Sequence, residues 1–529
     1  MQIKKMLRLS IALCLAVTVS LPGCGLYDLP DEIDDPSPSI EDFAVEPKQT
    51  QTNKRGDEIF SLVYDTGASL NPLTCADSSN TVLMGLMFEG LFYIDEEFTA
   101  QPLLCRSWTS LDGLNFIFEI RNGIIFHDGT DMTADDVVYS VNHARTIGPY
   151  VNRLSCVSDV FSENGLVKIV LSKPNMQFPA LLDIPVMKSG TGDDTIPVGT
   201  GPYTYTEAAD YRFLSAFTQY RDYTKLPIQR FYLKEYETED LIQAFEKSYI
   251  DLVVTNTSEP GFVQFSEEFE KRLAATTEMH FLGFNNKQGY CASALRRLIL
   301  SSLIDRDSLT TTLLPDTVPV VLPVNPLSPL YLMEVADTAL IKPESINDFM
   351  ISAFVEDFDH DEELEYISNN QVTDFALDMI VNRENNKKVS AARQIAETWK
   401  SKGYNIILHE MSWDAYQTAL NAGQYDIFYG EVKLTCDFDL SELLGTSGTA
   451  NFGVSDSELD SLIYAFNSSG KETRLEATKD LFVYLCDNVY IAPLLFEKLA
   501  VFTHRGVVSN MIPTQQNIYH RIKDWHIEF

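Results

Sequence analysis

One pattern between residues 375 and 408 constrains the fold of this chain most. Alternate positions from 375 to 381 are apolar, which predicts a strand. Apolar residues at helical spacing follow from 389 to 399, and Gly403 is placed to end that helix. A second strand is predicted from residue 406. Strand, helix and strand at this spacing form a βαβ unit, so we expect an α/β protein, and the length of 529 residues indicates several domains.

Other segments give local predictions. We expect a first strand near residues 59–64, and an apolar, helix-like run over residues 82–94 that ends at Gly90. Alternating apolar residues predict a strand over residues 116–120. Thr133 followed by acidic residues predicts the start of a helix, because a threonine side chain can satisfy a free backbone N–H group there.

The charge balance excludes one class of partner. The formal net charge is −36, from 76 acidic and 40 basic residues. Binding to nucleic acid requires a basic face that neutralises phosphates, which this composition does not favour. The acidity also argues against a protein that lies flat on anionic lipid. It weakly favours ligands that carry an ammonium group.

The amino terminus carries an export signal. Three basic residues within the first eight precede an apolar run over residues 11–20, which is too short to span a bilayer comfortably. Leu21-Pro22-Gly23-Cys24 follows and resembles the lipobox of bacterial lipoproteins, in which the cysteine receives a diacylglycerol. We therefore expect residues 1–23 to be removed as a signal peptide, and Cys24 to anchor the protein outside the bacterial cytoplasmic membrane. The alternative is an ordinary signal peptide with a chance cysteine.

Neither the cysteines nor the histidines are spaced for a metal site. The cysteines beyond Cys24 are scattered without a CxxC pair, and the eight histidines are dispersed without an HExxH motif. The acidic stretch at residues 356–363 could suggest a calcium loop. Such a loop needs glycine at its sixth position and a carboxylate at its twelfth. Counted from Asp357, these positions are Glu362 and Ser368. We expect a solvated acidic loop there, with calcium as the lesser alternative, and no metal or other cofactor.

Six segments in order resemble motifs of the extracellular solute-binding proteins of family 5, the peptide-binding lipoproteins of ABC importers. The segments are Ser69–Pro72, Phe88–Leu91, Ile120–Thr130, Thr133–Ser140, Pro197–Tyr203 and Arg296–Arg306. The resemblance runs from about residue 59 to the C-terminus and is poor over residues 310–370. Within it, we interpret His127-Asp128 as a turn with local hydrogen bonds rather than as a catalytic pair.

The resemblance implies a two-lobed clamshell of the periplasmic-binding-protein type II, in its peptide-binder form with an extra satellite domain. The implied divisions are lobe I at 57–88, 194–278 and 495–529, the satellite domain at 89–193, and lobe II at 279–494. Residues 24–56 are rich in polar residues and proline with few apolar anchors, which predicts a disordered tether. The lobes would close on a ligand by a hinge motion. Gly199, Thr200 and Gly201 are suited to a domain crossing and are the predicted hinge.

The same resemblance implies ligand-binding residues. Trp413 matches a tryptophan that walls side-chain pockets in oligopeptide binders, with core packing as an equal alternative. Asp437 matches an aspartate that takes the α-ammonium group of a peptide. Asp439 is the fallback, because the family's D-x-x-P pattern is missing here. A loop aspartate that caps residues 440–442 is the alternative for Asp437.

The other end of a ligand has no such match. Some oligopeptide binders carry an arginine seven residues after the tryptophan, where this chain has Leu420. Arg153 is an alternative cation for a ligand carboxylate, and Tyr150 is a candidate wall residue.

We therefore expect a monomeric binding lipoprotein without catalytic activity, which captures short peptides and hands them to an ABC permease in the membrane. The same scaffold serves importers of nickel chelates, haem and sugars, so another solute is the alternative, although scattered histidines disfavour a metal. A surface serine hydrolase is a remote alternative. Ser468-Ser469-Gly470-Lys471 is an S-x-x-K match, but no K-T-G or G-x-S-x-G motif accompanies it.

Overall fold

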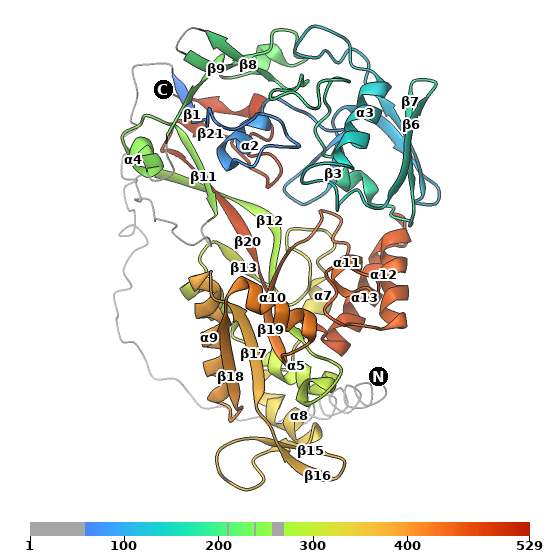
Figure 1. Ribbon diagram of the computed structural model, residues 1–529, viewed down its shortest axis with the longest axis vertical. Helices are drawn as coiled ribbons and strands as arrows, with labels where there is room; N and C mark the ends of the chain where they lie inside the picture. Colours follow the sequence, from blue (N-terminus) through green and yellow to red (C-terminus); the bar gives the residue numbers. More distant parts are fainter. Residues whose placement is uncertain (1–58, 209–210, 237–239, 257–268, 529) are drawn as a thin grey trace, which may run out of the picture. The chain divides into compact units, whose positions relative to one another are not determined.

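A computed structural model of the chain describes residues 59–208, 211–236, 240–256 and 269–528, and Figure 1 draws its helices and strands. The predictions for the signal peptide, for Cys24 and for the tether at 24–56 lie outside these ranges. No helix within them is both long enough and apolar enough to cross a membrane.

The described residues form a mixed α/β structure, which confirms the predicted class. The helices are α2 (Ser78–Met84), α3 (Ala134–Ala144), α4 (Leu241–Glu246), α5 (Ala294–Ser302), α6 (Arg306–Ser308), α7 (Met333–Ala336), α8 (Ile346–Ser352), α9 (Asn386–Lys400), α10 (Trp413–Ala422), α11 (Ser441–Leu444), α12 (Ser457–Ser468) and α13 (Arg474–Asn488). The first strands are β1 (Phe60–Val63), β2 (Phe92–Ile94), β3 (Ala100–Pro102), β4 (Cys105–Thr109), β5 (Asn115–Ile120), β6 (Val157–Glu163), β7 (Leu166–Leu171), β8 (Tyr203–Ala208), β9 (Tyr211–Ala216), β10 (Arg230–Lys234) and β11 (Leu252–Asn256). The later strands are β12 (Phe269–Phe284), β13 (Thr317–Pro319), β14 (Val355–Glu356), β15 (Glu365–Ser368), β16 (Gln371–Asp374), β17 (Leu377–Asn382), β18 (Ile406–Met411), β19 (Ile427–Lys433), β20 (Ile491–His504), β21 (Val508–Ser509) and β22 (His526–Ile527).

The first sheet joins strands that are far apart in the sequence. Its order is β1-β10-β9-β8, parallel between β1 and β10 and antiparallel elsewhere. β1 confirms the predicted first strand, and its Phe60 and Leu62 are buried. Phe60 packs edge to face on Phe231 of β10, with 5.4 Å between the ring centroids.

A second, antiparallel sheet has the order β4-β5-β7-β6 and packs against α3. β5 confirms the strand predicted over residues 116–120. The start predicted for α3 is also confirmed, because Thr133 is its N-cap. The carboxylate of Asp136 accepts hydrogen bonds from the backbone N–H and from the hydroxyl of Thr133, each at 2.8 Å.

The helix-like run expected over residues 82–94 is wrong. Helix α2 ends at Met84, and the chain is in strand β2 from Phe92. The backbone between them pairs with a distant segment: Val186 N–H donates to the Glu89 carbonyl at 2.9 Å, and Phe92 N–H donates to Leu182 at 3.2 Å. These groups are therefore not available for pairing along a helix.

The largest sheet contains the predicted βαβ unit. Its order is β11-β20-β12-β19-β17-β18, and β13 pairs with β20. β17 and β18 are parallel and are joined by α9, which buries Val389, Ala392 and Trp399, so the prediction for residues 375–408 is confirmed. β12 and β20 are 16 and 14 residues long and run side by side in antiparallel (Figure 1). β11 pairs with one end of β20, and β19 pairs with the opposite end of β12.

The hydrophobic cores also group distant segments. One core combines residues 60–252 with residues 501–525. Another brings Ile94, Phe98 and Ala180 together with residues 279–496. The boundaries of the two lobes and of the satellite domain stay a prediction.

The predicted hinge passes very close to residues 86–88. A β-carbon on Gly199 would lie 2.3 Å from the Met87 carbonyl oxygen, and one on Gly201 would lie 2.4 Å from the Met87 carbonyl carbon. Thr200 is buried and donates its hydroxyl hydrogen bond to Glu89 at 3.2 Å. Close backbone approach therefore explains both glycines, and the hinge role stays a prediction.

Candidate functional site

Asp437 is a buried carboxylate in the loop between β19 and α11. Only 4% of the residue is exposed. Oδ1 accepts a hydrogen bond from the Thr435 hydroxyl at 2.5 Å and a longer one from the Asp439 N–H at 3.4 Å. Oδ2 accepts one from the Asn175 side-chain amide at 2.7 Å. Both oxygens of the charged group are therefore hydrogen-bonded inside the protein, as a buried carboxylate requires.

Asn175 reaches Asp437 from a segment 262 residues earlier in the chain. It stands just before a 3-10 turn at Phe178–Leu181. Its Oδ1 accepts a hydrogen bond from Gln177 N–H at 2.8 Å, and its own N–H donates to the Gly113 carbonyl at 2.9 Å. Because Oδ1 is taken by a backbone donor, the side-chain NH₂ must face Asp437.

Asp439, the fallback residue, has different partners. It accepts hydrogen bonds from the Asn467 side-chain amide at 2.7 Å, from the Ser441 hydroxyl at 2.6 Å and from the Ser441 N–H at 2.9 Å. The capping contact that was the alternative for Asp437 is thus made by Asp439. Met176 N–H also donates to the Asn467 carbonyl at 2.8 Å. The segment that carries Asn175 therefore contacts both Asp437 and Asn467.

Arg474, the first residue of α13, lies behind this loop. It is 7% exposed, and its guanidinium stacks on the Phe466 ring at 3.6 Å from the centroid. Its Nη2 donates to the Asp437 carbonyl oxygen at 3.3 Å. Burial lowers the pKa of Arg474 to about 10, although both Asp437 and Asp439 oppose that shift. The side chain therefore remains a cation at neutral pH.

We call these residues the Asp437 group. Its members are Asp437, Thr435, Asn175, Asp439, Asn467 and Arg474. Burial is the largest influence on Asp437 and raises the pKa of its carboxyl, and the charge of Asp439 adds to this. The hydrogen bonds from Thr435 and Asn175 act in the opposite direction, since they stabilise the charged form.

Arg153 and Asp183 form an ion pair close to this group. Arg153 Nη2 lies 2.7 Å from Asp183 Oδ1, and the side chains are 17% and 10% exposed. The guanidinium carbon lies 4.8 Å from the centroid of the Tyr150 ring. Burial lowers the pKa of Arg153, but Asp183, Tyr150 and Cys436 together raise it more, so the net shift is upward. The charges of Arg153, Asp183 and Asp437 all act on the buried Cys436 thiol, whose pKa is raised mainly by burial.

A cavity of about 300 Å³ adjoins the Asp437 loop. Phe98, one of its lining residues, packs edge to face on Phe438 with 5.4 Å between the centroids. Gln516, another lining residue, donates a hydrogen bond to Cys436 Sγ at 2.9 Å. The cavity wall also includes Asp95, Glu96 and Arg272. Its size is at the lower end for a small-ligand site.

Trp413 begins α10 and is 48% exposed. Its ring stacks on Tyr416, with 5.9 Å between the centroids. Tyr416 is itself buried and donates its hydroxyl hydrogen bond to the Tyr429 carbonyl at 2.9 Å. One face of the Trp413 ring is therefore packed against a buried residue of the same helix. The position of Trp413 as a ligand wall stays a prediction.

His127 and Asp128 form local contacts. Asp128 accepts hydrogen bonds from the Thr130 N–H at 3.1 Å and hydroxyl at 2.7 Å, which confirms the expected turn. His127 Nε2 lies 3.0 Å from the Gly201 carbonyl oxygen. Burial lowers the pKa of His127, so the ring is neutral and can donate to that carbonyl.

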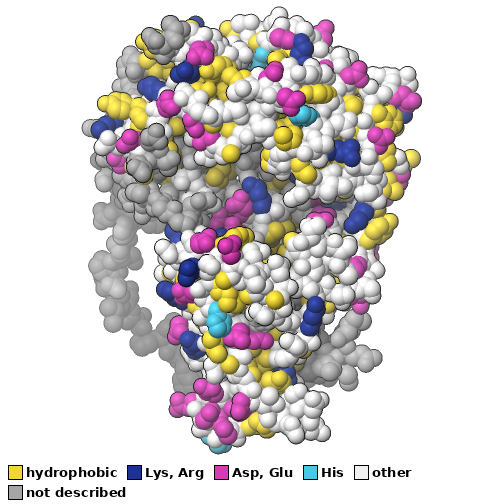
Figure 2. Space-filling view, in the orientation of Figure 1, with side chains coloured by type: hydrophobic (Ala, Val, Ile, Leu, Met, Phe, Trp, Pro, Cys, Tyr) yellow, Lys and Arg dark blue, Asp and Glu magenta, His cyan; other side chains and the backbone are white. Residues whose placement is uncertain are grey.

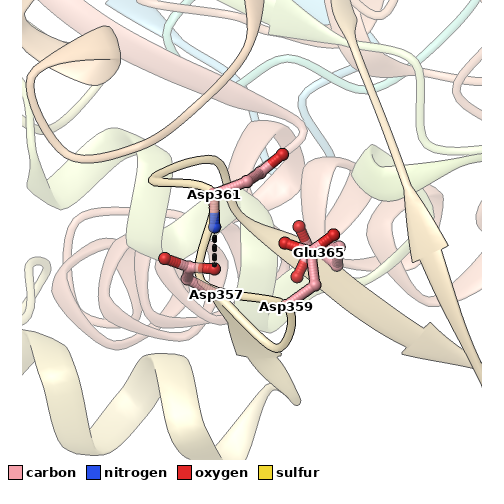
Figure 3. Close-up of side chains that lie close together, drawn as sticks. All are labelled: Asp357, Asp359, Asp361 and Glu365. Atoms are coloured by element: carbon pink, nitrogen blue, oxygen red, sulfur yellow. Dashed lines mark hydrogen bonds between the residues drawn. The ribbon is translucent and has the colours of Figure 1, made fainter.

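The acidic loop, residues 357–365, follows β14 and ends at the first residue of β15, and it gathers four carboxylates (Figure 3). Oxygens of Asp357, Asp359, Asp361 and Glu365 all lie within 4.8 Å of one another. Asp357 accepts backbone hydrogen bonds from residues 360, 361 and 362. Glu365 is buried, whereas Asp359 and Asp361 are exposed. Carboxylate oxygens are ligands that suit a hard divalent cation, so these residues could hold one, and sequence spacing alone did not reveal how closely they meet. Figure 2 shows acidic side chains gathered over the end of the protein that carries β15 and β16.

Several residues of the site were not predicted from the sequence: Thr435, Asn467 and Arg474 of the Asp437 group, and also Asn175 and Asp183. Asn175 and Asp183 follow no periodic pattern and belong to no motif, and a lone Asn or Asp in a loop is an ordinary turn residue. Only the fold brings them to Asp437 and Arg153.

Comparison with known proteins gives a family for this architecture. A family model described as bacterial extracellular solute-binding proteins, family 5 middle, matches residues 99–437. The glutathione-binding protein GsiB of Escherichia coli (strain K12) is 29% identical over 160 residues, which cover 28% of this chain and 31% of GsiB. The chain thus matches about a third of the length of these curated relatives.

Solved structures share the fold over most of the chain. The periplasmic murein tripeptide binding protein MppA, in an unliganded open form, has a TM-score of 0.73 and 17% identity, covering 90% of this chain and 98% of MppA. AppA from Bacillus subtilis, in complex with a nonapeptide, has a TM-score of 0.59, 18% identity and coverages of 89% and 98%. NikZ from Campylobacter jejuni, in complex with Ni(L-His), has a TM-score of 0.61, 20% identity and coverages of 88% and 98%. The fold is therefore the two-lobed α/β fold of solute-binding proteins, as predicted.

Proposed function

Because the chain belongs to family 5 of the bacterial extracellular solute-binding proteins, we propose that it captures short peptides between its lobes and delivers them to an ABC permease in the membrane. The observation that carries this proposal is the Asp437 group, a buried carboxylate held by donors from distant segments beside a cavity of about 300 Å³. GsiB is described as a glutathione-binding protein, and AppA as a complex with a nonapeptide, so peptide-like ligands occur among proteins similar to this one.

Asp437 is the proposed partner of the peptide's α-ammonium group. A carboxylate offers about four acceptor positions, and Asp437 uses two on Oδ1 and one on Oδ2 inside the protein. One position on Oδ2 remains for a ligand N–H. An ammonium–carboxylate contact at about 4 Å contributes roughly 4 kcal/mol at an effective dielectric constant of about 20.

The charges around Asp437 favour a ligand with a cationic end. Within the Asp437 group, Asp437 and Asp439 are carboxylates and Arg474 is the cation that acts on both. With all three ionised, one negative charge is in excess. A buried excess charge is unfavourable, and an ammonium group would neutralise it.

Arg153 is the proposed contact for the ligand carboxylate, with Tyr150 beside it. Nε of Arg153 is buried and forms no hydrogen bond within the described part of the chain, so it offers a donor. Its pairing with Asp183 means that a ligand carboxylate would share or replace an existing partner. Trp413 as a wall residue, and Gly199, Thr200 and Gly201 as the hinge, complete the proposed site.

Isothermal calorimetry with tri-alanine and N-acetyl-tri-alanine tests the ammonium contact. Asp437→Asn keeps the shape of the side chain and removes its charge, so we expect roughly 30-fold or greater loss of affinity for tri-alanine, with little change for the acetylated peptide. Asp439→Asn is the matched control, and a larger loss there would move the contact to the fallback residue. Equal losses for both peptides would contradict the ammonium role. A wild-type protein that binds neither peptide, and releases none on denaturation, would contradict peptide capture.

The proposed lipid anchor is attached to Cys24 and is independent of the ligand-binding site. Wild-type protein expressed with its signal should enter the detergent phase in a Triton X-114 partition, and Cys24→Ala should stay in the aqueous phase. A variant that partitions like the wild type would remove the lipoprotein assignment without affecting the binding site.

A further inference from the structure

The side chain of Asn175 is held more rigidly than its contact with Asp437 alone would require. The residue is 8% exposed. Gln177 N–H fixes its Oδ1 at 2.8 Å, and the Gly113 carbonyl fixes its backbone N–H at 2.9 Å. With Oδ1 fixed, the plane of the amide is set, and one N–H of the side-chain NH₂ donates to Asp437 Oδ2 at 2.7 Å.

Asp437 Oδ2, which accepts the hydrogen bond from Asn175, can accept one further hydrogen bond, and this position is free for a ligand. Thr435 and the Asp439 N–H both bind Oδ1, so a ligand N–H must approach Oδ2 beside the Asn175 amide. Asn175 would therefore lie next to the terminal group of a ligand bound at this oxygen, and its hydrogen bond sets the orientation of the oxygen.

We infer that Asn175 is a positioning residue of the ammonium subsite, and that it completes this subsite from outside the segment that carries Asp437. The inference rests on the proposed function, because it needs an ammonium group on Asp437. Asn175 does not replace Asp437 as the charged partner. It holds Oδ2 in place and supplies a donor that the buried carboxylate needs while it is ionised.

The charged state of Asp437 supports this role. Burial and the Asp439 charge raise the pKa of Asp437, and the hydrogen bonds from Thr435 and Asn175 lower it. Losing the Asn175 donor would therefore raise the pKa further. An ammonium ligand requires the ionised carboxylate, so its affinity should fall at a higher pH in the variant.

Most of the other titratable groups around Asp437 keep one protonation state between pH 4.5 and pH 8. They are Asp439 on the same loop, Arg474 on α13, the thiols of Cys156 and Cys436, and the pair of Arg153 with Asp183. Burial raises the pKa of Cys156 to about 11 and also raises that of Cys436, so both thiols stay neutral below pH 8. The two arginines keep their charge. Only carboxyl groups can respond, and Asn175 is bonded to one of them.

Asn467→Ala is the matched control for Asn175→Ala. Asn467 also donates its amide to a carboxylate at 2.7 Å, but that carboxylate is Asp439. Its contact with Met176 uses its backbone carbonyl and survives the substitution. Each variant thus removes one hydrogen bond from an amide to a carboxylate: Asn175→Ala removes it from Asp437, and Asn467→Ala removes it from Asp439.

The first experiment measures tri-alanine binding by calorimetry from pH 4.5 to pH 8. At pH 7 we expect Asn175→Ala to bind tri-alanine roughly 10- to 100-fold more weakly than the wild type, since a hydrogen bond to a charged group is lost. The pH at which affinity falls should move upward for Asn175→Ala and should not move upward for Asn467→Ala, because Asn467 bonds to Asp439 and not to Asp437. N-acetyl-tri-alanine should show no comparable loss. An unchanged pH profile, or equal losses for both peptides, would overturn the inference.

The second experiment uses no ligand and separates this inference from the proposed function. A carboxyl whose folded pKa is raised stabilises the protein below its unfolded pKa, and this stabilisation is lost as the pH rises through the folded pKa. Asn175→Ala raises that pKa further, so its melting temperature should fall below the wild-type value by more at pH 7 than at pH 4.5. If tri-alanine fails to bind wild-type protein, peptide capture is wrong, while this measurement still decides whether Asn175 supports the Asp437 charge. A difference that is equal at both pH values would overturn that role.

Discussion

The Asp437 group and the acidic loop at residues 357–365 both concentrate carboxylates, but the fold treats them in opposite ways. Asp437 is 4% exposed and receives its hydrogen bonds from residues as far away as Asn175. Asp357 receives its hydrogen bonds from backbone groups only three to five residues along the chain, and its exposed neighbour Asp359 faces water.

Burial explains this difference. A buried charge loses its water and must be stabilised by fixed donors or by an opposite charge, whereas an exposed charge is solvated and screened. Glu89 follows the same rule as Asp437: it is 6% exposed and bonds to Arg221, Tyr220 and Thr200. Acidic residues that are merely close together therefore do not identify a binding site. A buried carboxylate whose hydrogen-bond donors come from distant segments of the chain is the better indicator.

The largest expected effect is at Glu89. Glu89→Ala leaves the Arg221 guanidinium, the Tyr220 hydroxyl and a buried space without their partner, and we expect a loss of about 3–5 kcal/mol in the free energy of unfolding. Urea unfolding measures it.

Glu119→Ala is the control for that prediction. Its pair with Arg106 is 2.9 Å long, but the side chains are 41% and 62% exposed, so the loss should stay below about 1 kcal/mol. Equal losses for the two variants would break the distinction between buried and exposed carboxylates.

An intermediate effect is expected at Asp456, the N-cap of α12. Its carboxylate accepts hydrogen bonds from Glu458 N–H at 2.9 Å and from the hydroxyls of Tyr484 and Tyr490, each at 2.6 Å. Asp456→Ala should cost about 2–3 kcal/mol at pH 7, because it removes a helix cap and leaves two hydroxyls without that acceptor.

The pH dependence sharpens the Asp456 prediction. Burial raises the pKa of Asp456, but the hydrogen bonds from Tyr484, Tyr490 and the cap lower it more, so the net shift is downward. A lowered carboxyl pKa contributes stability above the unfolded value of about 4, and this contribution is lost as the pH falls below it. The stability gap between wild type and variant should therefore shrink from pH 7 to pH 3. A gap that grows in acid would contradict the assigned partners.

The smallest effect is expected in the acidic loop. Asp359→Asn removes one of several like charges that lie close together, so in EDTA at low salt we expect a change within about 0.5 kcal/mol, toward higher stability. High salt should remove this change. Thermal unfolding with and without calcium checks it. A variant that is less stable than the wild type only when calcium is present would show that the loop binds a cation, and would overturn the expectation of a solvated loop.

Local and sequential features of this protein could be predicted from its sequence. The βαβ unit at residues 375–408 and the strand over residues 116–120 follow from side-chain periodicity, and the helix start at Thr133 follows from one capping residue. The run at residues 82–94 could not be predicted this way. Its backbone pairs with residues 182–186, and a periodic pattern contains no information on such a distant partner.

The sequence by itself determined the α/β class and the family motifs, because each depends on residue type and short spacing. The resemblance carried by those motifs is what made Asp437 a candidate for the ammonium contact. Tertiary structure alone decided that Asn175 donates to Asp437 across 262 residues and that Asp183 pairs with Arg153. It also decided how deeply Asp437 is buried and where the cavity lies. The reason is that burial and partner choice arise from packing between segments, and the strength of a charged contact depends on that packing more than on the residues themselves.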